Sequence, residues 1–313
     1  MINDMAALDK FGVKKFFKTK PGSVNYYSNW DSTRTIATNG EDTVDPRLQV
    51  TCGSDPLYIG GGIAQWKTLN SSSRMYVNRG SQSSQWLNTE QTIYIRRNKD
   101  SNGGTGTNAT KSIQLRFRSN HHGADESPYG KVGDVSCGFG NYHIKWGEVL
   151  GDNLVSIEIE YIHGMYKRHI VDKTLVIPYD KYVGFKGICR NTDSTHIKLT
   201  GYTNLNVSSQ ENWKKTIEWT FSLSETNSDL EQSVFDFESS GGGGDDRVPI
   251  CLTGTPTGDS IVQSTKAGMI AKKIFNKPGY WNWVRIENAE HVDMKYYTVR
   301  EIMPKNAFNP AYL

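Results

Sequence analysis

The residue types best suited to chemistry are concentrated between Arg116 and His169. Cationic, acidic, amide and tyrosine side chains recur there at short intervals: Arg116, Arg118, Asn120, His121, His122, Tyr142, His143, Lys145, Glu158, Glu160, His163, Tyr166, Lys167 and Arg168. β-Elimination on a polymer of uronic acids needs cations to neutralise the sugar carboxylate, a base to remove the C5 proton and an acid for the leaving oxygen. The stretch therefore predicts a site for an acidic polysaccharide, with β-elimination as its candidate reaction.

The roles in such a reaction fall to seven residues: Tyr142 or His163 as base or acid, Arg116, Arg118 and Lys145 as the cations that bind the uronate, and Glu158 and Glu160 as the carboxylates that orient them. The simpler alternative is a solvated sheet face covered by cross-strand ion pairs, each contributing about 0–1 kcal/mol. Both interpretations stay open on the sequence alone.

Alternation of polar and apolar residues tells which side of a strand each of these side chains occupies, because successive side chains on a strand point to opposite faces. Tyr142, Ile144 and Trp146 alternate with His143 and Lys145. Two other segments give a sharper prediction: Gln114, Arg116, Glu158 and Glu160 on one exposed face, and Ile113, Leu115, Ile157 and Ile159 buried.

The elements that must position these residues are strands throughout. Eight Trp, sixteen Tyr and eleven Phe occur among many Gly, Ser, Thr and Asn residues, a composition typical of strands and turns. Strand-like runs recur along the chain at 74–78, 91–97, 112–118, 142–146, 155–162, 169–176, 182–189, 196–200, 216–221, 283–286 and 296–302. Their spacing predicts an all-β sandwich or barrel, with at most a short helix at 264–275.

Three parts are expected along the chain: an N-terminal arm at 1–24, one β-sandwich domain at 25–302 and a C-terminal tail at 303–313. The glycine-rich segment 239–246 is interpreted as a loop within the domain. The closing sequence MPKNAFNPAYL contains two prolines and two aromatic residues. Such arms could bind a neighbouring subunit, which predicts a homo-oligomer formed through them.

The segment SIEIEYIHG, from Ser156 to Gly164, resembles the EIDIEFLG strand of laminarinase-type glucanases. In that family the first Glu is the nucleophile, the Asp assists and the last Glu is the acid/base. The resemblance puts Glu158 at the Asp position and Glu160 at the acid/base position. Ser156 then occupies the nucleophile position, and a serine there cannot form the glycosyl-enzyme of retaining hydrolysis. We therefore expect no retaining glucanase activity.

A broader resemblance, over about residues 25–302, is to concanavalin A-like lectin and glucanase domains related to alginate and glucuronan lyases. NYYSNWD at Asn25–Asp31, the strands RMYV and IYIRR, and the closing YYTVREI carry it. It implies a two-sheet antiparallel jelly-roll sandwich whose concave face recognises polysaccharide. Gln114-Leu115-Arg116 partly matches the lyase pattern R-x-E-L-R, and the lyase patterns Q-I-H and Y-F-K-x-G-x-Y have no clear counterpart. The fold is thus better indicated than the activity.

Metal sites are weakly indicated. His121 and His122 with nearby Asp125 and Glu126 could bind zinc, although adjacent strand residues face opposite ways. Oxygen-rich turns at 100–108 and 244–246 could hold a structural calcium ion. No metal is expected in the candidate site itself. The cysteines, Cys52, Cys137, Cys189 and Cys251, lack the spacing of a zinc knuckle, and buried thiols or two disulfides remain as alternatives.

Charge and hydropathy bear on the partners. The chain has 36 Lys+Arg against 33 Asp+Glu, a balance that argues against a nucleic-acid partner. No stretch predicts a membrane span or a signal-peptide core. The expected partner is a polysaccharide, and the expected location is extracellular or on a virion surface. The rival function is a non-catalytic structural or adhesion protein of a virion or cell surface.

Overall fold

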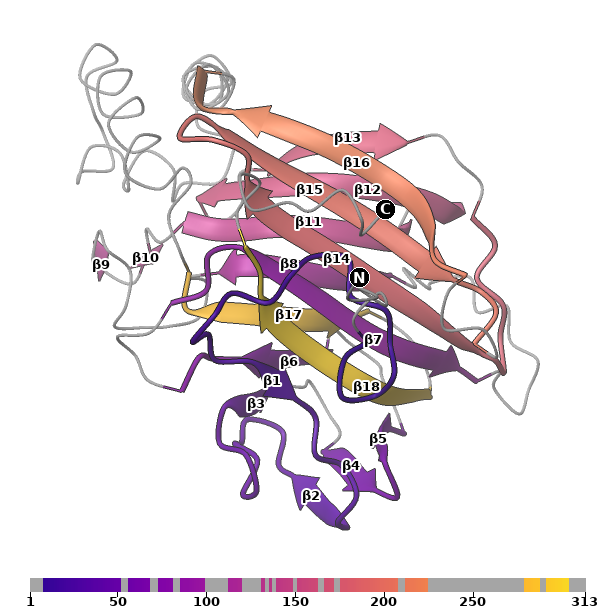
Figure 1. The fold of residues 1–313 in the computed structure, drawn as a ribbon. Coiled ribbons are helices and arrows are strands. Elements are labelled where there is room, and N and C mark those ends of the chain that lie inside the picture. Colours follow the sequence, from indigo (N-terminus) through magenta and orange to yellow (C-terminus); the bar gives the residue numbers. More distant parts are fainter. Residues whose placement is uncertain are drawn as a thin grey trace, which may run out of the picture.

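The fold was derived from a computed structural model of the chain, shown in Figure 1. It describes residues 8–51, 56–67, 73–80, 85–98, 112–119, 131–132, 135–136, 139–148, 151–162, 166–171, 175–207, 212–224, 279–287 and 291–303. In this part of the chain every named element is a strand, β1 to β18. Most of the strands form two antiparallel sheets, which lie one behind the other in Figure 1.

The seven-stranded sheet carries those predicted functional residues that the structure describes. Its strands, in spatial order, are β13 (Tyr166–Val171), β12 (Gly151–Ile162), β11 (Phe139–Glu148), β8 (Ile113–Ser119), β17 (Trp281–Ile286), β6 (Ser73–Val77) and β3 (Leu48–Thr51). All neighbouring strands in it are antiparallel. Strand β17, from near the end of the chain, is inserted between β8 and β6, so residues distant in sequence meet on this sheet.

The second sheet has nine strands and lies in front in the view of Figure 1. Its path runs through β16 (Lys214–Ser222), β15 (His196–Asn204), β14 (Tyr182–Asn191), β7 (Thr89–Arg97), β18 (Val292–Glu301), β5 (Ile63–Trp66), β4 (Leu57–Gly60) and β2 (Arg34–Ile36), and β1 (Tyr26–Tyr27) pairs with β18. A separate antiparallel pair consists of β9 (Lys131–Val132) and β10 (Val135–Ser136).

The core lies between the two sheets and is built from the apolar half of each alternating strand. Trp146 of the seven-stranded sheet contacts Phe185 of the other sheet edge-on, with ring centroids 5.2 Å apart. The sheets approach closely at Gly187, where a Cβ atom would lie 2.6 Å from Cζ of Phe117. Isolated sheets cannot bury both faces, so packing of these inner faces supplies most of the hydrophobic stabilisation.

The predicted fold class, an all-β, two-sheet antiparallel jelly-roll sandwich, is confirmed. Each of the eleven strand-like runs in the sequence overlaps a strand of the structure. Within the described residues no helix is long and apolar enough to cross a membrane. Cys189 is a buried free thiol, and the other three cysteines and the predicted helix at 264–275 lie outside the described residues.

The described part of the N-terminal arm packs against its own domain. The Phe16 ring lies edge-on to Tyr202, with centroids 4.5 Å apart, on the outer side of the nine-stranded sheet. The backbone of Thr19 forms a β-bridge with Ile302. The arm residues 8–24 are therefore joined to the sandwich in cis, and an oligomer formed through the arms remains a prediction. The tail beyond residue 303 lies outside the described residues.

Candidate functional site

Strand pairing brings two of the predicted residues, Arg116 and Glu158, into one row across the seven-stranded sheet. His143 of β11 lies directly opposite Arg116 of β8 on one side and Glu158 of β12 on the other. Opposed residues of antiparallel strands point to the same face. The row continues through Trp283 of β17 and Tyr76 of β6, so its described members are Tyr76, Trp283, Arg116, His143 and Glu158.

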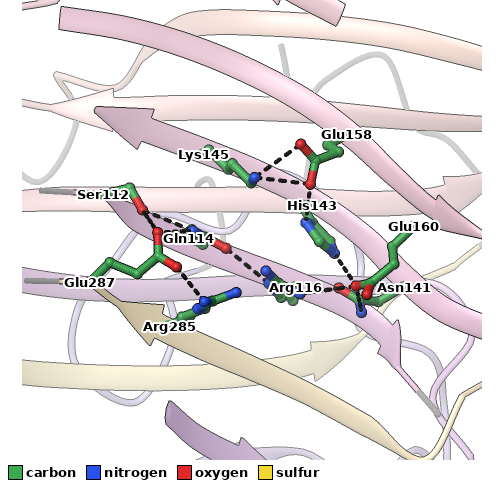
Figure 2. Close-up of polar contacts among 10 residues, drawn as sticks. All are labelled: Ser112, Gln114, Arg116, Asn141, His143, Lys145, Glu158, Glu160, Arg285 and Glu287. Atoms are coloured by element: carbon green, nitrogen blue, oxygen red, sulfur yellow. Dashed lines mark hydrogen bonds and ion pairs between the residues drawn. The ribbon is translucent and has the colours of Figure 1, made fainter. Parts of the chain in front are cut away.

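Charged side chains in and beside this row form a continuous network, drawn in Figure 2. Nζ of Lys145 donates to Glu158 at 2.9 Å. Nδ1 of His143 lies 3.1 Å from Oε1 of Glu158, and its Nε2 lies 3.3 Å from Oε2 of Glu160. His143 therefore links the two carboxylates that the E-x-E strand places on one face.

Arg116 continues the network toward the other strands. Its NH1 atom lies 3.2 Å from Oε2 of Glu160, and the same oxygen accepts a 2.9 Å hydrogen bond from Asn141. Its Nε atom donates to Oε1 of Gln114 at 2.9 Å. Each of these polar groups has a partner inside the protein, as buried polar groups require.

The last part of the network involves Glu287, which follows β17. Its Oε2 atom accepts hydrogen bonds from Oγ of Ser112 at 2.7 Å and from Nε2 of Gln114 at 2.9 Å. Its other carboxylate oxygen pairs with Arg285. The network thus contains three cations and three carboxylates, in the order Lys145, Glu158, Glu160, Arg116, Glu287 and Arg285.

Aromatic rings extend the network onto β17 and β6. The guanidinium carbon of Arg116 lies 4.4 Å from the centroid of the Trp283 ring. Tyr76 stacks on Trp283 with centroids 4.8 Å apart and meets Trp281 edge-on at 5.7 Å. Trp283 is buried on the charged side of the sheet, whereas Trp281 is partly exposed. The two tryptophans of the chain end therefore belong to the site and not to the core between the sheets.

The charged face is buried, which corrects the prediction of an exposed face. The side chains of Gln114, Arg116, Glu158 and Glu160 are all shielded from solvent, at 0–2% exposure. The predicted apolar partners Ile113, Leu115, Ile157 and Ile159 are buried as expected. Alternation identifies the side of a strand but not whether that side is covered. Solvent reaches the network at its ends, where 11% of the Lys145 side chain and 21% of the Arg285 side chain are exposed.

Two predicted site residues do not join the network. Tyr142 points into the core between the sheets, where it contacts Phe221, so the role of base or acid assigned to it does not fit its position. Arg118 has a positive φ of 53°, which breaks the alternation. Its Nε donates to the carbonyl of Leu87 at 2.7 Å. His163, the other candidate base or acid, lies outside the described residues.

Electrostatics fix the charge states within the network. Burial opposes ionisation of Glu158, but the neighbouring His143 and Lys145 outweigh it and hold the pKa of that carboxyl well below its usual range. Burial, aided by the Arg116 charge, lowers the pKa of His143 despite the two adjacent carboxylates. Burial also raises the pKa of Tyr142 far above its usual value. Glu158 is thus a stable anion, and Tyr142 a neutral phenol.

Residues that received no role from the sequence complete the site. The centre of the site contains His143, Asn141 and Gln114. The alternation of polar and apolar residues along their strands could have identified them. Arg285 and Glu287 come from a strand far away in sequence, and no local pattern marks them. Among the described residues no group of three or more His, Cys, Asp or Glu could hold a metal ion. The zinc candidates at 121–126 and the calcium candidates at 100–108 and 244–246 lie outside the described residues.

The chain is similar in structure to several sugar-binding domains and to a lyase. It matches the exoplasmic/lumenal domain of VIP36 in its calcium-bound form, with 10% identity and a TM-score of 0.42 over 86% of this chain and 90% of that one. It matches alginate lyase Aly36B in complex with an alginate trisaccharide, with 8% identity and a TM-score of 0.40 over 90% and 99% of the chains. It also matches the carbohydrate recognition domain of Emp46p in metal-free form, with 8% identity and a TM-score of 0.39 over 86% of this chain and 96% of that one.

No protein-family model and no curated protein sequence matches the chain. These structural similarities, at identities of 8–10% and TM-scores of 0.39–0.42, assign neither a superfamily nor a role to this chain.

Proposed function

We propose that this domain binds an acidic polysaccharide on the outer face of the seven-stranded sheet. The observation that carries the proposal is the row in which aromatic rings and charged groups occupy matching positions on adjacent strands, from Tyr76 and Trp283 to Arg116, His143 and Glu158. Strands lie about 4.8 Å apart. The row itself is buried, so an extended glycan would lie along its exposed rim and not on the row.

The network supports binding by holding its charges in fixed positions. Side chains that already have internal partners lose little conformational freedom when a ligand arrives, which favours affinity. The ligand would contact the rim of the network at the partly exposed Trp281 of β17 and the partly exposed end of Lys145. An aromatic ring at such a rim can stack on the apolar face of a sugar.

The proposal is limited to binding. β-Elimination needs a base and an acid on the side of the sheet where the ligand lies, and Tyr142 lies on the opposite side. An assembly or adhesion function, the rival prediction, relied on arms that reach other subunits, and the described arm packs on its own domain. Binding of an acidic glycan accords with the predicted extracellular or virion-surface location.

The test is calorimetric titration with polyuronates, sulfated glycans and neutral glucans, while absorbance of unsaturated products is followed in parallel. We expect saturable binding of polyuronates without product formation. Trp281→Ala should weaken binding about three- to tenfold, the loss of one aromatic contact. Trp219→Ala is the matched control, since Trp219 is 39% exposed on the edge strand of the other sheet. Absence of binding to every acidic glycan would refute the proposal.

A further inference from the structure

Two arginines face each other on the outer side of the seven-stranded sheet. Arg74 of β6 and Arg285 of β17 are direct register partners in an antiparallel pair. Side chains at such positions point to the same face with Cβ atoms about 5 Å apart, and like charges placed there repel each other. A pair of this kind is favourable where an anion bridges the two guanidinium groups.

Among the described residues, a carboxylate pairs with Arg285 but not with Arg74. Arg285 pairs with Glu287. Arg74 contacts an aromatic ring instead: its guanidinium carbon lies 5.8 Å from the centroid of Trp283. Within the described part of the chain, no carboxylate lies within ion-pair distance of Arg74.

Two hydrogen-bond donors without acceptors also favour an anion bound between the arginines. The Nε atoms of Arg74 and Arg285 are both buried and have no hydrogen-bond acceptor in the described structure. A buried donor without an acceptor costs about 1–3 kcal/mol. Both side chains are nevertheless partly open to solvent as whole residues, so a small anion can approach them from outside.

We infer that Arg74 and Arg285 together bind the carboxylate of one sugar residue, which makes the ligand a polyuronate; this inference rests on the binding function proposed above. Guanidinium groups match the planar carboxylate with two parallel hydrogen bonds, which a lysine cannot do. The indole of Trp283 beneath Arg74 keeps the guanidinium plane in position through a cation–π contact.

The experiment compares three polymers with the wild type, Arg74→Gln, Arg74→Lys and Arg285→Gln. The polymers are a polyuronate, the same polymer with its carboxylates reduced to primary alcohols, and a sulfated neutral glucan. We expect each Gln variant to weaken polyuronate binding about tenfold, the loss of one charge-assisted contact at a partly exposed site. Arg74→Lys should recover only part of the affinity. Binding of the reduced polymer should be weak and unchanged by any variant.

Lys215→Gln is the control for general charge, because Lys215 is exposed on the edge strand of the other sheet. Melting temperatures identify any variant that fails to fold, and Arg74→Gln keeps the Arg285–Glu287 pair intact. Wild-type binding of polyuronate that neither Gln variant weakens would overturn the inference and leave the proposed function standing. Equal Arg74-dependent binding of the sulfated glucan would overturn the assignment to carboxylate. A wild type that binds no acidic glycan would refute the proposed function itself.

Discussion

The guanidinium group of Arg116 lies over the indole ring of Trp283, 4.4 Å from its centroid. This contact joins two strands that are distant in sequence and adjacent in the sheet. On its other side Arg116 binds the Glu160 carboxylate and the Gln114 amide. One side chain thus connects the charged half of the row to its aromatic half, and its removal should affect both.

Arg116→Met should lower the free energy of unfolding by about 3–5 kcal/mol, because it leaves the buried Glu160 carboxylate without its cation. Adding Glu160→Gln removes the unpaired charge, so the double variant should be less destabilised than the sum of the two single variants. Urea unfolding of the four proteins measures this coupling. Strict additivity would show that the two residues do not interact energetically.

Acid should weaken the sandwich through Glu90 of β7, which pairs with Lys186 at 2.6 Å and with Arg300 at 2.8 Å. Burial opposes ionisation of Glu90, but the charges of Arg300 and Lys186 prevail and lower its pKa to about 2. Because the folded pKa lies below the unfolded value of about 4.3, this stabilisation is complete above pH 4–5 or so and is lost as the pH falls toward about 2.

Urea unfolding between pH 7 and pH 3 measures this loss. Glu90→Gln should flatten the acid dependence in that range and lower stability at pH 7 by about 3–5 kcal/mol, since it leaves buried cations unpaired. Glu41→Gln, at an exposed position, should change neither quantity. An acid slope that Glu90→Gln leaves unaltered would assign the acid sensitivity to other carboxylates.

Phe16→Ala should loosen the N-terminal arm. The Phe16 ring contacts Tyr202 and Trp213 and lies 5.2 Å from Nζ of Lys186, so its loss removes aromatic and cation–π contacts. We expect a loss of about 1–2 kcal/mol in stability and faster trypsin cleavage at the arm lysines 14, 15 and 18. Leu8→Ala, at a residue 53% exposed, is the control and should cleave at the wild-type rate.

Retaining glucanase activity should be absent. Ser156 lies opposite Lys145 on the charged face, at the position where a retaining enzyme of this pattern needs a carboxylate nucleophile. Glu158 is held by Lys145 and His143. Incubation with laminarin should release no reducing ends, and Ser156→Glu need not create activity. Sustained hydrolysis with retained anomeric configuration would contradict this prediction.

Sequence reasoning predicted the strands and the residues that share a face, because alternation is a local property. Alternation already placed Tyr142 and Lys145 on different faces of their strand, so the sequence itself contained a signal against giving them the same chemistry. Arg118 escaped the pattern because its positive φ turns the side chain away from the face that alternation assigns to it. A backbone irregularity of this kind leaves no mark on the polar pattern.

The covered state of the charged face and the contribution of β17 could not be predicted. Both depend on which distant segments meet in space. Arg285 and Trp283 reach the site because β17 pairs with β8 and β6, a register that no local pattern encodes. The aromatic residues of the arm were visible in the sequence, but their docking surface around Tyr202 and Trp213 was not.

The pairing of the arm with the last strand has a mechanical consequence. The amide of Met303 donates to the carbonyl of Lys18, and the amide of Lys20 donates to the carbonyl of Glu301, each at 3.0 Å. The chain therefore enters and leaves the sandwich at neighbouring points. Tension applied to the two ends would load this short ladder first and peel it open one hydrogen bond at a time. Tension between the two ends would therefore act on these hydrogen bonds and on the Thr19–Ile302 bridge before it reached the two packed sheets.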